Sequence, residues 1–200
     1  MPKLNVITGA TGQLGSHIAE QLIQHGERVR APVRPGADTA FLEALGVEVL
    51  PVDYQDVASL RATIAGAELV YHCAARVSDW GPWRVFQAEA IDVARNVLDA
   101  CAAEQVGRVL FVSSISVYGH PHLRPGQRIT EESPLGQNMW LCDHYARAKI
   151  LGVVLNRVDM IKGEYAYYYG HYSSYYRHNT EERTEDQHYE DEDDQEKMSA

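Results

Sequence analysis

One run of residues in this 200-residue chain has the spacing of a phosphate-binding turn. It follows a short apolar segment and contains Gly9, Thr11, Gly12, Gln13, Leu14 and Gly15. A first glycine permits a tight turn, a second lets backbone N–H groups approach a diphosphate, and a third lets a helix pack closely on a sheet. The run therefore predicts a dinucleotide-binding turn. No Gly-Lys-Ser/Thr follows it, so phosphoryl transfer is not expected.

A phenol and an ammonium group form a second candidate set. Tyr145 and Lys149 are four residues apart, which places them on one face of a helix. A free phenol titrates near about pH 10, and a neighbouring cation favours its phenolate form. The pair predicts an acid/base group beside a supporting cation. Ser114 follows a predicted strand, and ligands of open α/β sheets bind at that edge, so we expect its hydroxyl to bond the substrate oxygen.

Arg34 bears on the choice of cofactor. It lies 19 residues beyond Gly15, where binders of the unphosphorylated dinucleotide usually carry an acid. A guanidinium group there suits a ribose 2′-phosphate, so the sequence slightly favours NADP over NAD. The alternative is that Arg34 is a solvated loop cation.

The elements that must position these residues alternate between short apolar runs and longer amphipathic stretches. Strands are predicted over residues 4–7, 28–33, 47–52, 68–72 and 108–112, and helices over 13–25, 83–104 and from about 143. This alternation is typical of βα units, so the predicted fold class is α/β, a Rossmann-like doubly wound parallel sheet whose carboxyl-terminal part is truncated. Residues 151–158 suit either a sixth strand or the continuation of a helix.

Charge and composition exclude several classes of protein. The net charge is −10, and residues 181–200 hold ten acids and two bases, so the body is nearly neutral. This distribution argues against sequence-independent nucleic-acid binding. No run approaches the roughly 18 apolar residues of a membrane span, and the amino end lacks a signal-peptide pattern. Three cysteines without metal-ligand spacing suit reduced, mostly buried thiols in a cytoplasmic protein.

Residues 1–150 resemble the NAD-dependent epimerase/dehydratase group of the extended short-chain dehydrogenase/reductase superfamily. The matching segments are Thr8–Gly15, Val52–Tyr54, Tyr71–Ala75, Val112–Ser114, Val117–Gly119, Thr130–Pro134 and the pair Tyr145 and Lys149. Val77–Trp83 is similar to the 3β-hydroxysteroid dehydrogenase and dihydroflavonol reductase-like branch. The family's Asn-x-x-Gly-Thr stretch is replaced here by Ala90–Ala94, so one polar support is missing.

The resemblance implies roles for individual residues. Asp53 and Tyr54 would contact the adenine, and Ala74 and Ala75 would line the cofactor path. Ser114, Tyr145 and Lys149 would be the catalytic trio around a carbinol–ketone hydride transfer, and Lys149 would also bond a cofactor ribose.

The carboxyl-terminal segment resembles a different class of protein. Residues 151–190 are similar to the tyrosine-rich tail of bacterial polysaccharide-synthesis tyrosine kinases, whose tail tyrosines are phosphorylated. The predicted organisation is therefore an NAD(P)-binding domain over 1–150, an extra strand or helix extension over 151–163, and a disordered acidic tail over 164–200.

Three functions stay open at this point. The chain is an oxidoreductase, epimerase or dehydratase acting on a carbinol of a nucleotide-sugar or of a steroid- or flavonoid-like molecule. Alternatively, it binds the dinucleotide without turnover, or it is an interaction protein whose tail is phosphorylated. The expected partners are a small-molecule substrate, a tyrosine kinase acting on the tail and a second copy in a homodimer, with no nucleic acid.

Overall fold

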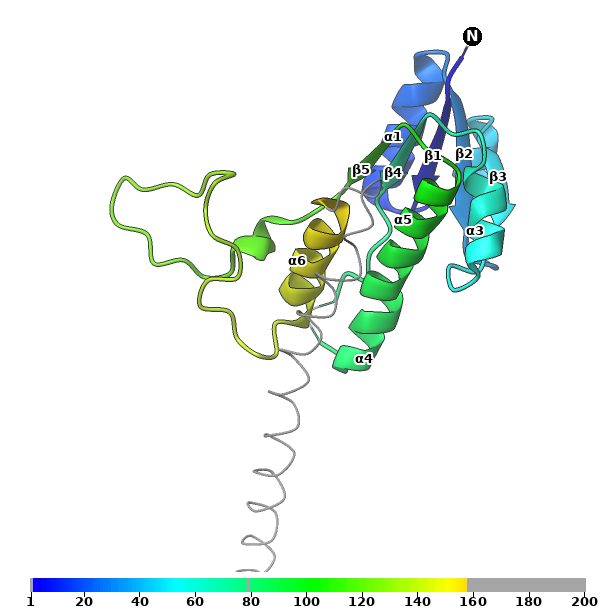
Figure 1. The fold of residues 1–200 in the computed structure, drawn as a ribbon. Helices are drawn as coiled ribbons and strands as arrows, with labels where there is room; N and C mark the ends of the chain where they lie inside the picture. Colours follow the sequence, from blue (N-terminus) through cyan, green and yellow to red (C-terminus); the bar gives the residue numbers. More distant parts are fainter. Residues whose placement is uncertain (1, 79, 158–200) are drawn as a thin grey trace, which may run out of the picture. The chain divides into compact units, whose positions relative to one another are not determined.

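The structure, a computed structural model, describes residues 2–78 and 80–157. A five-stranded parallel sheet with the order β3-β2-β1-β4-β5 forms its centre (Figure 1). The strands are β1 (Leu4–Thr8), β2 (Arg28–Val33), β3 (Glu48–Pro51), β4 (Leu69–His72) and β5 (Arg108–Phe111). The predicted Rossmann-like sheet is confirmed, and each predicted strand agrees to within one residue at either end.

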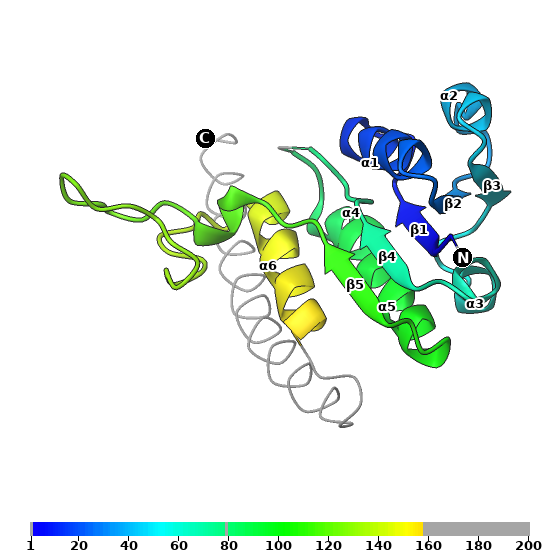
Figure 2. The same cartoon turned by 90° about the horizontal axis from the view of Figure 1, so that it is seen from above.

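Helices cover both faces of this sheet. They are α1 (Gln13–Gln24), α2 (Ala40–Ala44), α3 (Val57–Ile64), α4 (Trp83–Phe86), α5 (Val93–Ala103) and α6 (His144–Arg157), with a π-helical turn η1 (Gln87–Asp92) and a 3-10 turn η2 (Ile115–Tyr118). Figure 2 shows α1 and α2 on one face and α3 and α5 on the other. Helix α6 packs beside α5 and the end of the sheet formed by β5.

The core has one layer on each face of the sheet. Val6 of β1 belongs to a cluster with Leu60 of α3 and Val97 of α5. The next residue, Ile7, belongs to a second cluster that includes Ala19 of α1. Successive strand residues point to opposite faces, so a strand covered on both sides is buried along its whole length. The full burial of β1 follows from this position and brings its carboxyl end to the middle of the sheet edge.

The predicted long helix over 83–104 is a continuous helical stretch that contains an unexpected π turn. Helix α4 leads directly into η1 and then α5. Apolar spacing did not reveal the turn, because the buried positions that follow the helical period lie in α5, after the turn. Helices α2 and α3 were also missed because they are short, although Asp56 supplies a side-chain cap that accepts a hydrogen bond from the Ala58 amide.

The alternatives for residues 151–158 are resolved up to Arg157. Helix α6 continues through this segment, so the helix extension is confirmed there and the sixth strand is wrong. A Cβ atom at Gly152 would lie 2.4 Å from the Phe111 ring, so this glycine lets α6 lie close to β5. The predictions for residues 158–200, including the phosphorylated tyrosines, lie outside the described residues.

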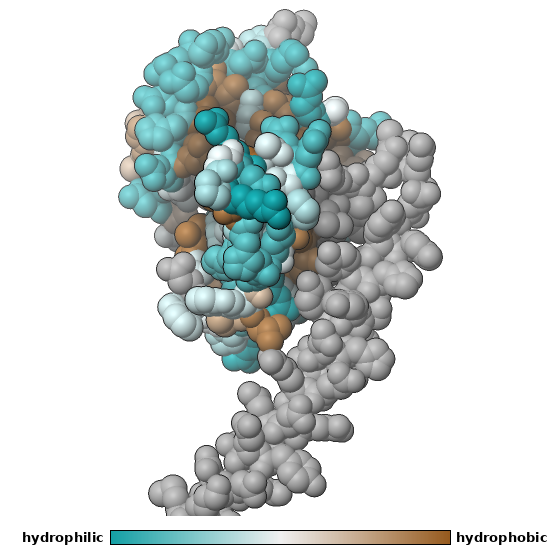
Figure 3. Space-filling view, turned by 90° about the vertical axis from the view of Figure 1, so that its left-hand side faces the viewer, coloured by the Kyte–Doolittle hydropathy of each residue, from teal (hydrophilic) through white to brown (hydrophobic). Residues whose placement is uncertain are grey.

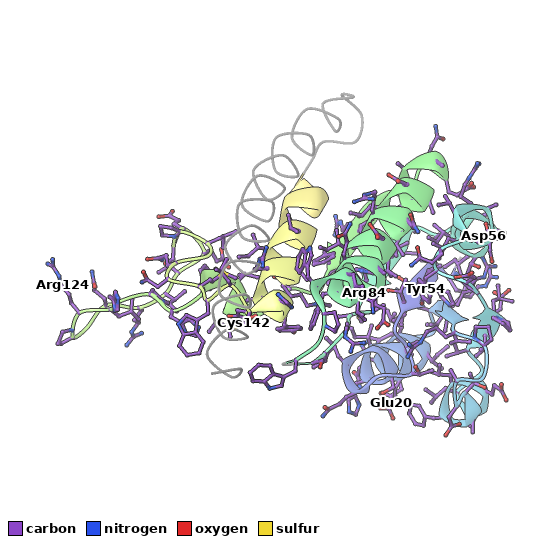
Figure 4. All side chains as sticks on the ribbon, turned by 90° about the horizontal axis from the view of Figure 1, so that it is seen from below. Glu20, Tyr54, Asp56, Arg84, Arg124 and Cys142 are labelled. Carbon is purple, nitrogen blue, oxygen red and sulfur yellow. The ribbon has the colours of Figure 1, made fainter. Side chains whose placement is uncertain are left out.

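Residues 119–143 link η2 to α6 and extend away from the sheet (Figure 1). In Figure 4, Arg124 lies at the far end of this segment and Cys142 lies near the start of α6. Cys142 is exposed, Cys73 is half-buried and Cys101 is buried, so the expectation of mostly buried thiols is wrong for Cys142. None of the helices in the described ranges is long and apolar enough to cross a membrane.

Candidate active site

The turn between β1 and α1 requires glycine at two positions. Gly9 has a φ of +70°, and a Cβ atom there would lie 2.7 Å from the amide nitrogen of Ala74. A Cβ atom at Gly15 would lie 2.4 Å from the carbonyl oxygen of Gly9. The backbone therefore folds tightly against both α1 and the segment after β4, so that the turn and the end of β4 are direct neighbours.

The start of α1 offers backbone donors to an anion. Gly12 directly precedes α1. No side chain caps the start of this helix, and the first turn of the helix carries no acidic residue. A Cβ atom at Gly12 would meet only the Gly9 carbonyl oxygen, at 3.3 Å, so the other side of Gly12 is open. Thr11, Gln13 and Leu14 are exposed at this turn. The N–H groups of a first helical turn lack partners within the helix and carry partial positive charge, so this donor set fits a diphosphate.

A buried histidine lies beside this turn at the carboxyl edge of the sheet. Thr8, His72 and Phe111 are in register at the ends of β1, β4 and β5. The hydroxyl of Thr8 lies 2.8 Å from His72 Nδ1 and accepts a hydrogen bond from the Ala74 amide. Burial, with a smaller effect of the nearby Lys149 charge, lowers the pKa of His72 to about 3. The imidazole is therefore neutral at physiological pH and ties the two strand ends together.

A small pocket, partly open to solvent, begins at this edge. It is lined by His72, Ala74, Ala75, Arg76, Ala90, Phe111, Tyr145, Ala148 and Lys149. The structure thus brings together Tyr145, Lys149, Ala74 and Ala75, four of the residues predicted from the sequence. Burial of one face of α6 places Tyr145 and Lys149 on the side that faces β4 and β5.

Lys149 is held at the wall of the pocket. Its Nζ donates a hydrogen bond to the Val112 carbonyl oxygen at 2.9 Å and lies 5.9 Å from the centre of the Tyr145 ring. Burial lowers the pKa of Lys149, and the neighbouring Cys73 acts in the opposite direction. The side chain is 7% exposed, so it places a positive charge beside the tyrosine in a poorly solvated position.

Ser114 does not join these two residues at the pocket wall. Its hydroxyl caps η2, accepting hydrogen bonds from the amide and the hydroxyl of Ser116 at 3.2 and 2.8 Å. It is not among the residues that line the described pocket. Its predicted contact with a substrate oxygen remains a prediction.

The residues assigned to the adenine end of the cofactor have separate environments. Tyr54 is buried, its hydroxyl donates to the Pro32 carbonyl oxygen at 2.8 Å, and burial raises its pKa to about 12. Asp53 is exposed and accepts a hydrogen bond from the Gln55 amide, and Arg34 is exposed directly after β2. Tyr54 therefore supports the interior of the fold, while adenine contacts by Asp53 and Tyr54 remain a prediction.

Sequence reasoning missed several residues of the pocket wall. His72 and Phe111 are the last residues of their strands, and Arg76 follows the predicted Ala74 and Ala75. The sequence signal that could have identified them is their position at or just after the end of an apolar run, because the carboxyl ends of parallel strands lie at one edge of a sheet. Within the described ranges, no group of three or more His, Cys, Asp or Glu side chains is placed to hold a metal ion.

Comparison with known proteins identifies the family. Residues 5–185 match the family model described as the NAD dependent epimerase/dehydratase family, so the chain belongs to this family. The matched range extends beyond residue 150, where the motifs recognised in the sequence end.

Individual relatives agree with this assignment. Sterol demethylase protein B of Methylococcus capsulatus is 35% identical over 116 residues, which are 57% of this chain and 35% of that protein. Cinnamoyl-CoA reductase 1 of Oryza sativa subsp. japonica is 34% identical over 145 residues, covering 69% of this chain and 40% of the reductase. A short-chain dehydrogenase/reductase superfamily protein from Agrobacterium tumefaciens, crystallised with bound NAD, is 29% identical with a TM-score of 0.63, covering 76% of this chain and 43% of that one. The chain spans less than half the length of these three relatives.

Proposed function

We propose that this chain binds a nicotinamide dinucleotide along the carboxyl edge of its sheet and transfers a hydride between the cofactor and a carbinol or ketone. One observation carries the proposal: Tyr145, Lys149 and the end of β4 line a single pocket, and β4 continues into Ala74, which contacts the glycine turn. A diphosphate at the start of α1 would therefore belong to a molecule that extends toward Tyr145.

Three residues of the chain have different roles in the proposed reaction. When bound, the nicotinamide group supplies or accepts the hydride. The hydroxyl of Tyr145 donates a proton to the ketone oxygen during reduction and, as phenolate, accepts it from the carbinol during oxidation. Lys149 stabilises the phenolate through its charge. His72 stays neutral and holds the strand ends that form the floor of the pocket.

The position of Arg34 supports the phosphorylated cofactor. It is exposed at the end of β2, and a bidentate, charge-assisted pair with a 2′-phosphate is open to it. The relative from Agrobacterium tumefaciens was crystallised with NAD, which supports the unphosphorylated form for that protein. We retain a slight preference for NADP in this chain as part of the proposal.

A second candidate function is dinucleotide binding without turnover. The position of Ser114 favours it, because this residue is not among those that line the described pocket. Cofactor affinity is then unaffected, and only the chemical step is lost.

Fluorescence titration with NADH and NADPH tests the binding step. We expect saturable binding of both, with NADPH the tighter, and Arg34→Ala should remove that difference without weakening NADH. No binding of either cofactor by folded protein would overturn the proposal. Turnover with a panel of ketones then separates the two functions, since a cofactor-bound protein that reduces none of them supports the second.

A further inference from the structure

Arg76 has a fixed position at the wall of the pocket, and the proposed chemistry leaves it unused. It lines the pocket together with Tyr145 and Lys149. Its Nη1 donates to a carboxylate oxygen of Glu89, in η1, at 2.7 Å, and its guanidinium lies 5.4 Å from the centre of the Phe86 ring. The π turn thus supplies the residue that orients this arginine, and π turns frequently occur at functional sites.

One edge of the Arg76 guanidinium has no hydrogen-bond partner in the described part of the chain. Glu89 occupies Nη1, whereas Nε is buried and has no hydrogen-bond partner in the described part of the chain. A Cβ atom at Gly81 would lie 3.6 Å from Nη2, so a small residue stands beside this edge. An unpaired buried donor is costly, and proteins usually satisfy such groups with a ligand or water. The Nε–Nη2 edge is the fork with which arginine binds a carboxylate through two parallel hydrogen bonds.

Exposed apolar side chains lie on the two segments that border this arginine. Val77 and Trp80 are 82% and 79% exposed and follow Arg76 along the chain. Trp140 is 71% exposed and precedes α6, which carries Tyr145. A hydrogen bond of 3.0 Å between His144 Nδ1 and the Gly81 carbonyl oxygen joins these two segments. Exposed aromatic groups of this kind often border ligand-binding grooves.

We infer that the pocket takes an oxo acid with an aromatic or similarly apolar body, whose carboxylate is bound by Arg76 while its ketone faces Tyr145. This inference rests on the proposed function. In the reaction, the ketone carbon gains a hydride from the reduced cofactor and the ketone oxygen gains a proton from Tyr145. The products are a hydroxy acid and the oxidised cofactor.

A pair of probes that differ by one carboxylate tests the inference. Benzoylformate and acetophenone are titrated calorimetrically into protein saturated with NAD⁺ or NADP⁺, whichever binds more tightly, because no hydride is then available for turnover. We expect benzoylformate to bind roughly 10- to 100-fold more tightly than acetophenone. Arg76→Met should remove this difference and Arg76→Lys should retain part of it. Glu89→Gln should strengthen benzoylformate binding, because the glutamine oxygen can still accept from Nη1 while the negative charge that repels the ligand carboxylate is removed.

The control is Arg84→Met, which removes an exposed arginine on α4 (Figure 4) and should leave both affinities unchanged. Equal affinity for the two probes, no binding of benzoylformate, or an unchanged preference in both Arg76 variants would overturn the inference while leaving the proposed function intact. A large loss of cofactor affinity in Arg76→Met would also overturn it, because Arg76 would then be a cofactor-binding residue. Failure of the wild-type protein to bind either cofactor would overturn the proposed function and this inference with it.

Discussion

The hydroxyl of Tyr145 is the one phenol at the wall of the described pocket, and Lys149 lies one helical turn away on the same face of α6. Replacement of Tyr145 by Phe removes the proton donor and keeps the ring. We expect kcat to fall roughly 10²- to 10⁴-fold with cofactor affinity unchanged, measured by steady-state turnover and by titration. Tyr118→Phe, which alters a residue of η2 outside the pocket lining, is the matched control. Full turnover by Tyr145→Phe would contradict the assigned role.

His72 makes stability depend on pH in a defined direction. Its folded-state pKa of about 3 is below the ordinary value of 6.5, so only the unfolded chain binds this proton between the two values. The contribution of the neutral His72 to the free energy of unfolding is complete above about pH 6.5. It is lost as the pH falls toward 3, by at most about 1.4 kcal/mol per pH unit. Urea unfolding at several pH values between 7 and 4.5 should show this slope.

His72→Gln is the comparison that isolates this effect. The variant is expected to be less stable than wild type at pH 7, because it disturbs the bond to Thr8, and to lose less stability on acidification. Parallel curves of unfolding free energy against pH for the two proteins would show that His72 is not the titrating group.

The sequence reveals some of these residues and conceals others for a physical reason. Tyr145 and Lys149 could be paired because both lie on one helix, where spacing determines proximity. His72, Arg76 and Phe111 come from or follow different strands, and only the sheet order brings them together. The capping role of Ser114 depends on the local path of η2, which no spacing rule predicts.

The β1–α1 element contains a matched pair of glycines with different expected effects. A Cβ atom at Gly15 meets backbone at 2.4 Å, so Gly15→Ala should destabilise the fold by about 2–3 kcal/mol. Gly12 has φ −84° and ψ 166°, which alanine adopts, and its nearest atom is at 3.3 Å. Gly12→Ala should cost about 1 kcal/mol or less and still weaken NADH binding about tenfold or more, because its methyl group obstructs the diphosphate.

Denaturant unfolding and NADH titration of both variants separate packing from binding. Gly12→Ala that binds NADH like wild type would show that the diphosphate does not approach the backbone at this turn. A Gly15→Ala protein of wild-type stability would contradict the close packing of α1 on the turn.

Strong, uniform patterns made most elements predictable. Each of the strands β1 to β5 contains a short apolar run and so stood out, although β2, β3 and β5 also carry exposed residues. The sequence Leu151–Leu155 also suits a strand, but α6 extends through it to Arg157. Gly152 lies within this segment and packs against the Phe111 ring as part of the helix, and a strand here would lose that contact. The π turn η1 and the helix α2 are each too short to show a helical repeat of apolar residues, so the sequence pattern did not predict them.

At the scale of the whole molecule, cofactor binding should stabilise the fold. A ligand present at 100 times its Kd adds about 2.7 kcal/mol to the unfolding free energy, which for a chain of this size raises Tm by about 5–10 °C. Thermal unfolding followed by circular dichroism with increasing NADH should show this rise. Gly12→Ala should show a smaller rise at the same NADH concentration, and an equal rise would point to a different binding site.

One face of the molecule bears on the predicted homodimer. Hydrophobic side chains on the face shown in Figure 3 are interspersed with hydrophilic ones and form no single continuous area among the coloured atoms. A second copy therefore remains a prediction. The three relatives described above are more than twice as long as the segments of them that this chain covers, so their substrates are no guide to this pocket by themselves.

A crystal structure of the protein grown with NAD⁺ tests the central claim most directly. The account predicts the diphosphate within about 3 Å of the backbone N–H groups at the start of α1 and the nicotinamide ring in the pocket beside Tyr145. A cofactor bound elsewhere, or density for the diphosphate with the nicotinamide directed away from Tyr145 and Lys149, would contradict it.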